Sequence, residues 1–137
     1  MFSKIMVPVD LVHKESLGKA LEVAGDMAKR HGASIEVVSV GGALPGKLGH
    51  TPEEFGETVK AFAKDLADKF GVPVEGDPVI SHDPEIETTG ALMREIERTG
   101  ADLVIVASHE PGVLEHVFSS HGGYIAQHAK CSVFVVR

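Results

Sequence analysis

The chain has 137 residues, of which 43% are hydrophobic and 24% are charged. These fractions are those of ordinary globular proteins, and the length suits one core, so we expect a single domain over residues 1–137 rather than disorder or a fibrous repeat. Twenty acidic residues against thirteen lysines and arginines give a net charge of −7, which argues against a nucleic-acid partner.

The elements of the N-terminal part can be predicted from its apolar patterns. The continuous apolar run 5–9 is typical of a strand that is buried on both faces. Residues 17–28 carry apolar side chains at helical spacing, and the helix is expected to end at His31 and Gly32, a cation followed by a glycine cap. A second strand is predicted over residues 34–40.

Residues 41–50 contain four glycines and one proline, which indicates a mobile loop. A helix is predicted to begin directly after it. Residues 51–54 (Thr-Pro-Glu-Glu) combine a threonine N-cap, a proline in the first turn and a glutamate at the third helical position, which is the pattern of a capping box. Apolar residues on one face continue this helix until Gly71 ends it.

The third strand is predicted within residues 72–81, where Gly76, Asp77 and Pro78 weaken the pattern. Asp83 and Pro84 mark the start of a third helix. Its inward face is assigned to Ile86, Gly90, Met93 and Ile96.

The remaining elements are predicted as a strand over 103–107, a helix near 122–130 and a strand over 133–136. Strands that alternate with helical segments need crossover connections, which are right-handed and produce a parallel sheet. We therefore predict a three-layer α/β fold, with an open, parallel, five-stranded sheet and helices on both faces.

No apolar run reaches the roughly 20 residues of a membrane-spanning helix, and the first residues lack the features of a secretory signal. The single cysteine, Cys131, has no partner for an internal disulfide. Together these features lead us to expect a cytoplasmic protein without membrane contact.

In an open parallel sheet, ligands bind beyond the carboxyl ends of the strands, where the strand order reverses. The residues predicted at those ends are Asp10, Val40, Gly41, Gly42, His82, Asp83, Ala107, Ser108 and His109. The last helix begins at the same edge, where Ser119 or Ser120 can act as N-cap and two glycines follow His121. Amides of Gly122 and Gly123 can approach a phosphate closely; the alternative is that these glycines admit a close neighbouring element.

Residues 41–48 nearly match a phosphate-binding loop of the pattern Gly-x4-Gly-Lys-Ser/Thr. However, Leu48 replaces the hydroxyl that would bind Mg²⁺, and Pro45 removes a backbone donor. We interpret the segment as a glycine-rich lid, from which Lys47 can swing over a bound anion.

Three segments, in order along the chain, resemble the universal stress protein family. They read MVPVD at residues 6–10, ADLVIVASH at 101–109 and AKCSVFVVR at 129–137. The Ala-Ser-His-x-Pro and Ala-x-Cys-Ser-Val patterns within them look like those of one subgroup of small stress proteins. The resemblance covers essentially the whole chain.

This resemblance implies an α/β domain with the strand order 3-2-1-4-5 of adenine-nucleotide alpha hydrolase-like folds, which forms a homodimer. It also implies binding of ATP or AMP, with or without Mg²⁺. Asp10 would accept a hydrogen bond from ribose or base, Val40 would pack on adenine, and Ser120 with nearby amides would hold phosphate. The full set of implied binding residues is Pro8, Val9, Asp10, Val40, Ala107, Ser108, His109, Ser119, Ser120, His121 and Gly122.

The family's phosphate loop has the pattern Gly-x2-Gly-x9-Gly-Ser/Thr, and this chain has Ala107, Glu110 and Ser119 in place of its glycines. Two main hypotheses therefore stay open. One is a nucleotide-binding regulatory module of the stress response with at most slow ATP hydrolysis or autophosphorylation. The other is a dimeric interaction protein, with an unknown protein partner, whose degenerate site no longer binds nucleotide. In both, the strand at 133–136 is expected to pair with its copy.

A minor third hypothesis is an enzyme that acts on another adenylate-containing metabolite. No catalytic residue is assigned, because the chain has no Gly-x-Ser-x-Gly motif and no activated cysteine; Cys131 is expected to be structural. The histidines at 109, 116, 121 and 128 lack the spacing of metal ligands. We expect them at the surface or in loops, without a metal.

Overall fold

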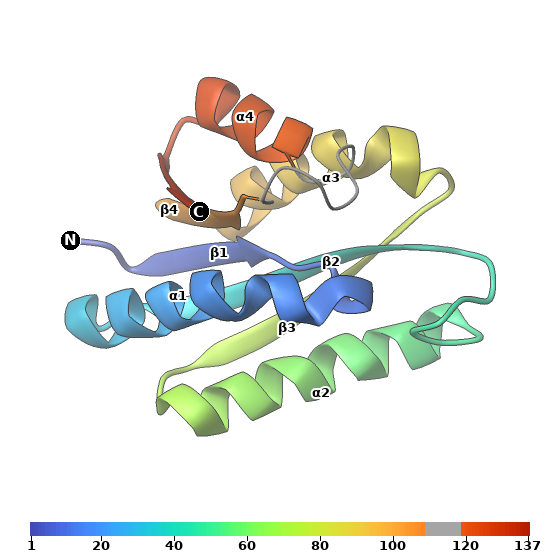
Figure 1. Cartoon of the computed structure of the whole chain (residues 1–137), viewed down its shortest axis with the longest axis horizontal. Coiled ribbons are helices and arrows are strands. Elements are labelled where there is room, and N and C mark those ends of the chain that lie inside the picture. The colour runs from blue at the N-terminus through green and yellow to red at the C-terminus, as the bar shows by residue number, and fades with distance from the viewer. Residues whose placement is uncertain (109–118) are drawn as a thin grey trace.

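The fold is seen in a computed structural model, which describes residues 1–108 and 119–137 (Figure 1). Its elements are, in order, β1 (Lys4–Pro8), a 3-10 helix η1 (Leu11–Leu17), α1 (Gly18–His31), β2 (Ser34–Gly42), α2 (Pro52–Phe70), β3 (Val74–Ser81), α3 (Pro84–Thr99), β4 (Leu103–Ala107), α4 (Ser119–His128) and β5 (Ser132–Val136). The strands form one parallel sheet in the order β3-β2-β1-β4-β5. The predicted fold class and strand order are confirmed.

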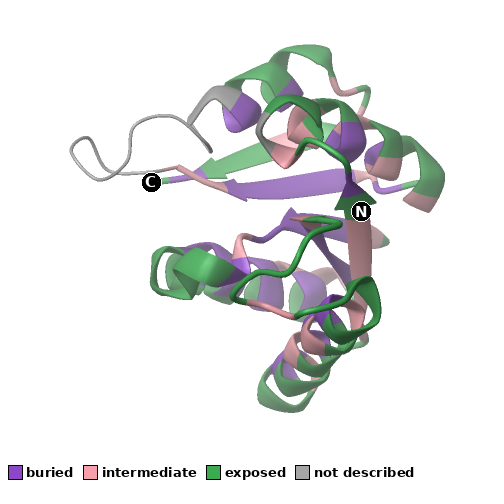
Figure 2. Cartoon of the chain, turned by 90° about the vertical axis from the view of Figure 1, so that its right-hand side faces the viewer, coloured by how far each residue is buried: buried purple, intermediate pink, exposed green. Residues whose placement is uncertain are grey.

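Helices lie on both faces of this sheet. α1 and α2 cover one face, and α3 and α4 cover the other (Figure 1). The central strands are buried between the two layers, whereas the outer sides of the helices are exposed (Figure 2). Within the described residues, no helix is both long and apolar enough to cross a bilayer.

The central strands divide the core into two, because successive side chains of a strand point to opposite faces. Ile5 and Val7 of β1 pack beneath α1 and α2, whereas Met6 packs beneath α3 and α4. β4 alternates in the same way, with Ile105 on the first face and Val106 on the second. This two-sided burial accounts for the continuous apolar runs in the sequence.

The helix ends follow the predicted signals. Gly32 and Gly71 end α1 and α2 in the left-handed conformation, with φ of +65° and +67°, which glycine adopts without strain. At the start of α2, the Thr51 hydroxyl accepts a hydrogen bond from the Glu54 amide at 3.1 Å. The Glu54 carboxylate accepts from the His50 amide at 2.7 Å, one residue earlier than in the standard capping box.

The third strand lies within its predicted range, but Gly76, Asp77 and Pro78 do not interrupt it. β3 pairs with β2 along its whole length. It lies at the edge of the sheet, where a proline is tolerated since one side of the strand needs no ladder hydrogen bonds. Gly76 is required by packing: a Cβ atom there would lie 2.8 Å from the Val59 carbonyl oxygen of α2.

The inward face of α3 differs from its prediction. Ile86 is 78% exposed and Gly90 is exposed, whereas Ala91, Leu92 and Ile96 are buried. At 100° per residue, Ile86 and Gly90 lie on the side of the helix away from these three residues. The predicted face was therefore wrong at its first two positions and right at Ile96.

Candidate functional site

A cavity of about 240 Å³ opens at the carboxyl ends of β1 and β2. Its lining comes from four parts of the chain: the residues after β1, the end of β2 with the loop that follows, the start of α2 and the start of α3. The lining residues that carry the following argument are Asp10, Val12, Val40, Leu44, Lys47 and Phe55. The cavity lies at the carboxyl edge of the sheet, where open parallel sheets bind ligands, beside β1 and β2 rather than between β1 and β4 where the strand order reverses.

Asp10 leaves β1 at this edge and caps the 3-10 helix η1, which sequence analysis did not predict. One carboxylate oxygen accepts from the Val12 amide at 3.0 Å, and the other lies 2.8 Å from Nδ1 of His13. Each carboxylate oxygen can accept a second hydrogen bond, and the Asp10 side chain is 26% exposed. Asp10 is thus held in place and still has acceptor capacity toward the cavity.

The end of β2 forms an apolar wall of the cavity. Val40 is half-buried and lines it. Gly41 follows, and a Cβ atom on Gly41 would lie 2.8 Å from the ring of Phe55 in α2. The Phe55 ring therefore packs directly on the β2 backbone, and this contact needs a glycine.

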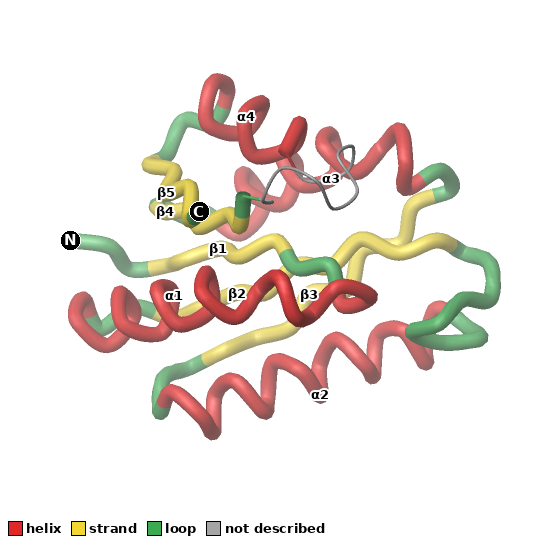
Figure 3. Tube along the Cα trace, in the orientation of Figure 1, coloured by secondary structure: helices red, strands yellow, loops and turns green. Residues whose placement is uncertain are grey.

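The loop after β2 forms another wall of the cavity, and it lies against the start of α2 (Figure 3). Gly46 and Gly49 exchange two backbone hydrogen bonds, of 2.9 and 3.4 Å, which close a tight turn. The Leu48 carbonyl accepts from the Thr58 hydroxyl at 2.9 Å, and the Leu48 side chain packs against the core. The segment interpreted as a lid thus lines the cavity, and hydrogen bonds hold its backbone at residues 46–49.

The other predicted binding residues lie along the same edge of the sheet but are not among the described residues that line this cavity. Pro8 and Val9 are buried, and the Val9 amide donates to the Val38 carbonyl at 2.8 Å. Ala107 ends β4, and the Ser108 amide donates to the Val136 carbonyl at 2.7 Å. Ser119 and Ser120 form the first turn of α4. His109, Glu110 and His116 lie outside the described residues.

His121, in the first turn of α4, is buried and contacts the Thr89 hydroxyl of α3. The expectation of a surface or loop position was therefore wrong for this histidine. Burial lowers the pKa of its imidazole, because the charged form loses hydration. The hydrogen bond to Thr89 shows how a histidine can be accommodated between two helices.

The two glycines of α4 have different surroundings. A Cβ atom on Gly122 would lie 3.4 Å from Cγ2 of Val106, so this glycine does allow a close approach to β4. A Cβ atom on Gly123 would meet nothing within 4 Å. Both glycines lie in the first half of α4, which runs from Ser119 to His128.

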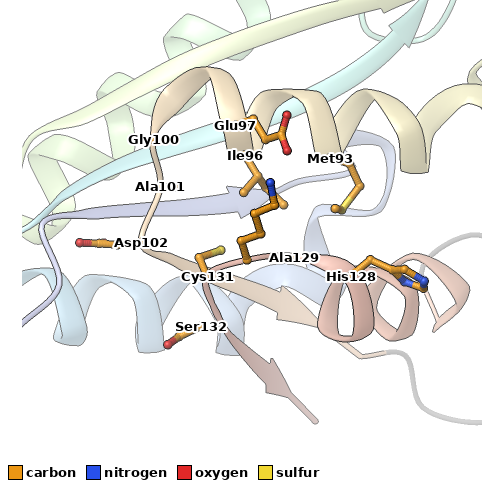
Figure 4. A pocket seen from close by; sticks show the side chains of 11 residues that line it. Met93, Ile96, Glu97, Gly100, Ala101, Asp102, His128, Ala129, Cys131 and Ser132 are labelled. Carbon is orange, nitrogen blue, oxygen red and sulfur yellow. The ribbon is translucent and has the colours of Figure 1, made fainter.

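A second cavity, of about 520 Å³, lies between the end of α3 and the connection from α4 to β5 (Figure 4). Met93, Ile96 and Cys131 contribute apolar side chains to it. Burial raises the pKa of the Cys131 thiol, which therefore stays protonated. None of the predicted binding residues that the structure describes lines this cavity.

Val12, Leu44 and Phe55 are among the residues of the first cavity that sequence reasoning did not assign to a binding site. Val12 and Leu44 are apolar side chains that are 42% and 84% exposed, and Phe55 lies one turn into α2. The only sequence signal for these lining residues was an apolar side chain shortly after a strand end or next to the glycine-rich loop. That signal is weak, because single exposed apolar residues are common.

The universal stress protein family model matches residues 1–137. Two relatives named universal stress protein G, from Shigella flexneri and Salmonella typhimurium, are 28% and 26% identical to this chain, and each match covers both chains completely. A solved universal stress protein structure from Archaeoglobus fulgidus has 18% identity and a TM-score of 0.73 over the whole of both chains. A universal stress protein in complex with cAMP has 20% identity and a TM-score of 0.71, covering 99% of this chain and 97% of that one.

Proposed function

Because the chain belongs to the universal stress protein family, we propose that it is a cytoplasmic regulatory protein of the stress response that binds an adenine nucleotide, ATP or AMP. The observation that carries this proposal is the cavity that unites Asp10 and Val40. These two residues were assigned to the ligand from the sequence, and they come from different strands. Structural neighbours are described as complexes with cAMP and with dAMP, which supports the same ligand class.

The cavity suits a nucleoside. Val12, Val40 and Leu44 offer apolar surface to a planar base, and Asp10 offers an acceptor to an amine or hydroxyl group. The start of α4 is proposed to hold phosphate through Ser120 and nearby amides, because the helix dipole favours negative charge there. Mg²⁺ would accompany ATP. We also assign the chain to the Ala-Ser-His-x-Pro subgroup on its sequence.

No residue is assigned as a general base for hydrolysis. Any ATP hydrolysis or autophosphorylation should therefore be slow compared with the roughly 10 per second of a typical enzyme. The proposal is thus a binding and regulatory role.

Calorimetric titration of nucleotide-stripped protein with AMP and ATP, with and without Mg²⁺, tests the proposal. We expect micromolar binding and a loss of about tenfold in Asp10→Asn, which keeps the helix cap but weakens the acceptor. Asp26→Asn is the matched control, because Asp26 is exposed on α1 away from the cavity. Absence of heat at millimolar nucleotide would refute the proposal.

A second candidate function is a dimeric interaction protein whose site no longer binds nucleotide. Phe134 and Val135 favour it, because they are 45% and 40% exposed on β5 at the edge of the sheet. We propose a homodimer through this strand for either function, so the oligomeric state does not separate them. Ser119→Gly does: a large rise in ATP affinity would identify a site that the serine disables.

A further inference from the structure

The charges that line the nucleotide cavity are unusually few. Among its described lining residues, Asp10 and Lys47 are the only charged ones. The chain carries a net charge of −7, and Asp10 adds local negative charge. An anionic ligand at this edge therefore needs a nearby cation, and Lys47 is the one that the cavity supplies.

The position of Lys47 is set by the turn that carries it. Lys47 and Leu48 are the central residues of the turn closed by Gly46 and Gly49. A Cβ atom on Gly49 would lie 2.6 Å from the Phe55 amide nitrogen, so the turn sits directly on the start of α2. The Leu48 side chain packs inward while Lys47 is exposed at the rim.

Within the described residues, the Lys47 ammonium group forms no ion pair. By contrast, Lys4, Lys69 and Arg98 form ion pairs with carboxylates. Lys47 also lines a neighbouring hollow together with Glu54 and Glu57. Neither is paired with Lys47, and Glu54 accepts from the His50 amide instead.

We propose that Lys47 binds the phosphate group of the nucleotide and makes the cavity selective for nucleotides over nucleosides. This inference rests on the proposed function and adds a residue of the β2–α2 loop to the phosphate contacts. A lysine suits this position because its ammonium group has three donors on a long flexible side chain, which can follow a phosphate from the rim. The turn that carries Lys47 is held by the Gly46–Gly49 hydrogen bonds, so the cost of binding from this turn is mainly the ordering of one side chain.

The test compares AMP with adenosine by calorimetry, in the wild type, Lys47→Gln, Lys47→Arg and the control Lys64→Gln. Lys64 is exposed on the same helix that holds the loop and lines neither the cavity nor the hollow. We expect Lys47→Gln to lose about tenfold in AMP affinity, as for one charge-assisted contact, with adenosine affinity unchanged within about twofold. Lys47→Arg should retain AMP binding, Lys64→Gln should match the wild type, and salt should weaken AMP binding less in Lys47→Gln than in the wild type.

Two results would overturn the inference while leaving the proposed function intact. One is AMP affinity in Lys47→Gln that stays close to the wild-type value. The other is an equal loss of AMP and adenosine affinity, which would mean that Lys47 supports the cavity wall. If the wild type binds neither compound, the proposed function fails and the inference fails with it.

Discussion

Gly76 of β3 and Gly56 of α2 lie in the same helix–sheet contact, and alanine should have opposite effects at the two positions. A Cβ atom at residue 76 would lie 2.8 Å from the Val59 carbonyl oxygen and 3.1 Å from Cα of Lys60. Both neighbours are backbone atoms, so the helix itself has to move. Such overpacking costs about 1–3 kcal/mol, offset by about 0.5–1 kcal/mol because alanine is better than glycine within a strand. We expect Gly76→Ala to lower the free energy of unfolding by about 1–2 kcal/mol.

Gly56→Ala is the matched control. Its Cβ atom would lie 3.5 Å from Cγ of Pro78, which is an ordinary contact. Alanine is preferred over glycine within a helix by about 1 kcal/mol, so this variant should be more stable than the wild type. Urea unfolding followed by circular dichroism measures both changes. If Gly76→Ala is as stable as the wild type, the close approach of α2 to β3 is not what requires the glycine.

Two further predictions concern buried polar groups. Arg98 of α3 donates a hydrogen bond of 3.0 Å to the buried Glu36 of β2. Arg98→Met should lower the free energy of unfolding by about 2 kcal/mol, which is less than for a fully buried pair because Lys4 remains 3.3 Å from Glu36. Arg94→Met, at an exposed position, serves as control in the same urea experiment, and equal effects of the two substitutions would contradict the argument. Since burial lowers the pKa of folded His121, the unfolded chain binds the proton more readily, so stability is present above about pH 6.5 and is lost as the pH falls below it. Between pH 8 and pH 5 the melting temperature of the wild type should fall further than that of His121→Gln. An equal fall in both proteins would refute the contribution of His121 to the pH dependence of stability.

The predictable part of the fold is the part in which local pattern and burial agree. Continuous apolar runs indicated β1 and β4, and glycine caps indicated the ends of α1 and α2. The third strand was predicted in the right place, but its sequence did not show that it is uninterrupted, because packing against α2 and the edge position decide whether Gly76 and Pro78 are tolerated. Sequence reasoning failed at the start of α3, because an isolated apolar residue such as Ile86 does not reveal which side of a helix meets the sheet.

The candidate site was predictable for a similar reason. Asp10 lies two residues beyond β1 and Val40 lies near the end of β2, so the parallel topology brings them to one edge. The contributions of Leu44 and Phe55 depend on how the loop folds onto α2, and the turn and side-chain contacts that set this path leave no hydrophobic periodicity in the sequence. Glu36 illustrates the same limit, since a glutamate in a strand gives no local sign that Arg98 lies opposite it.

Helix α2 links the fold to the site through Gly41 and Gly76. The Phe55 ring packs on Gly41 at one end of the contact between α2 and the sheet. One turn further along α2, the helix backbone at Val59 packs on Gly76. In Gly41→Ala the new methyl group would displace a side-chain ring that can rotate, whereas Gly76→Ala displaces backbone. We therefore expect Gly41→Ala to be the less destabilising of the two, yet to reduce adenosine affinity more, because the displaced ring is part of the cavity wall. Unfolding and adenosine titration of both variants test this, and unchanged adenosine binding in Gly41→Ala would show that the Phe55 wall does not contact the ligand.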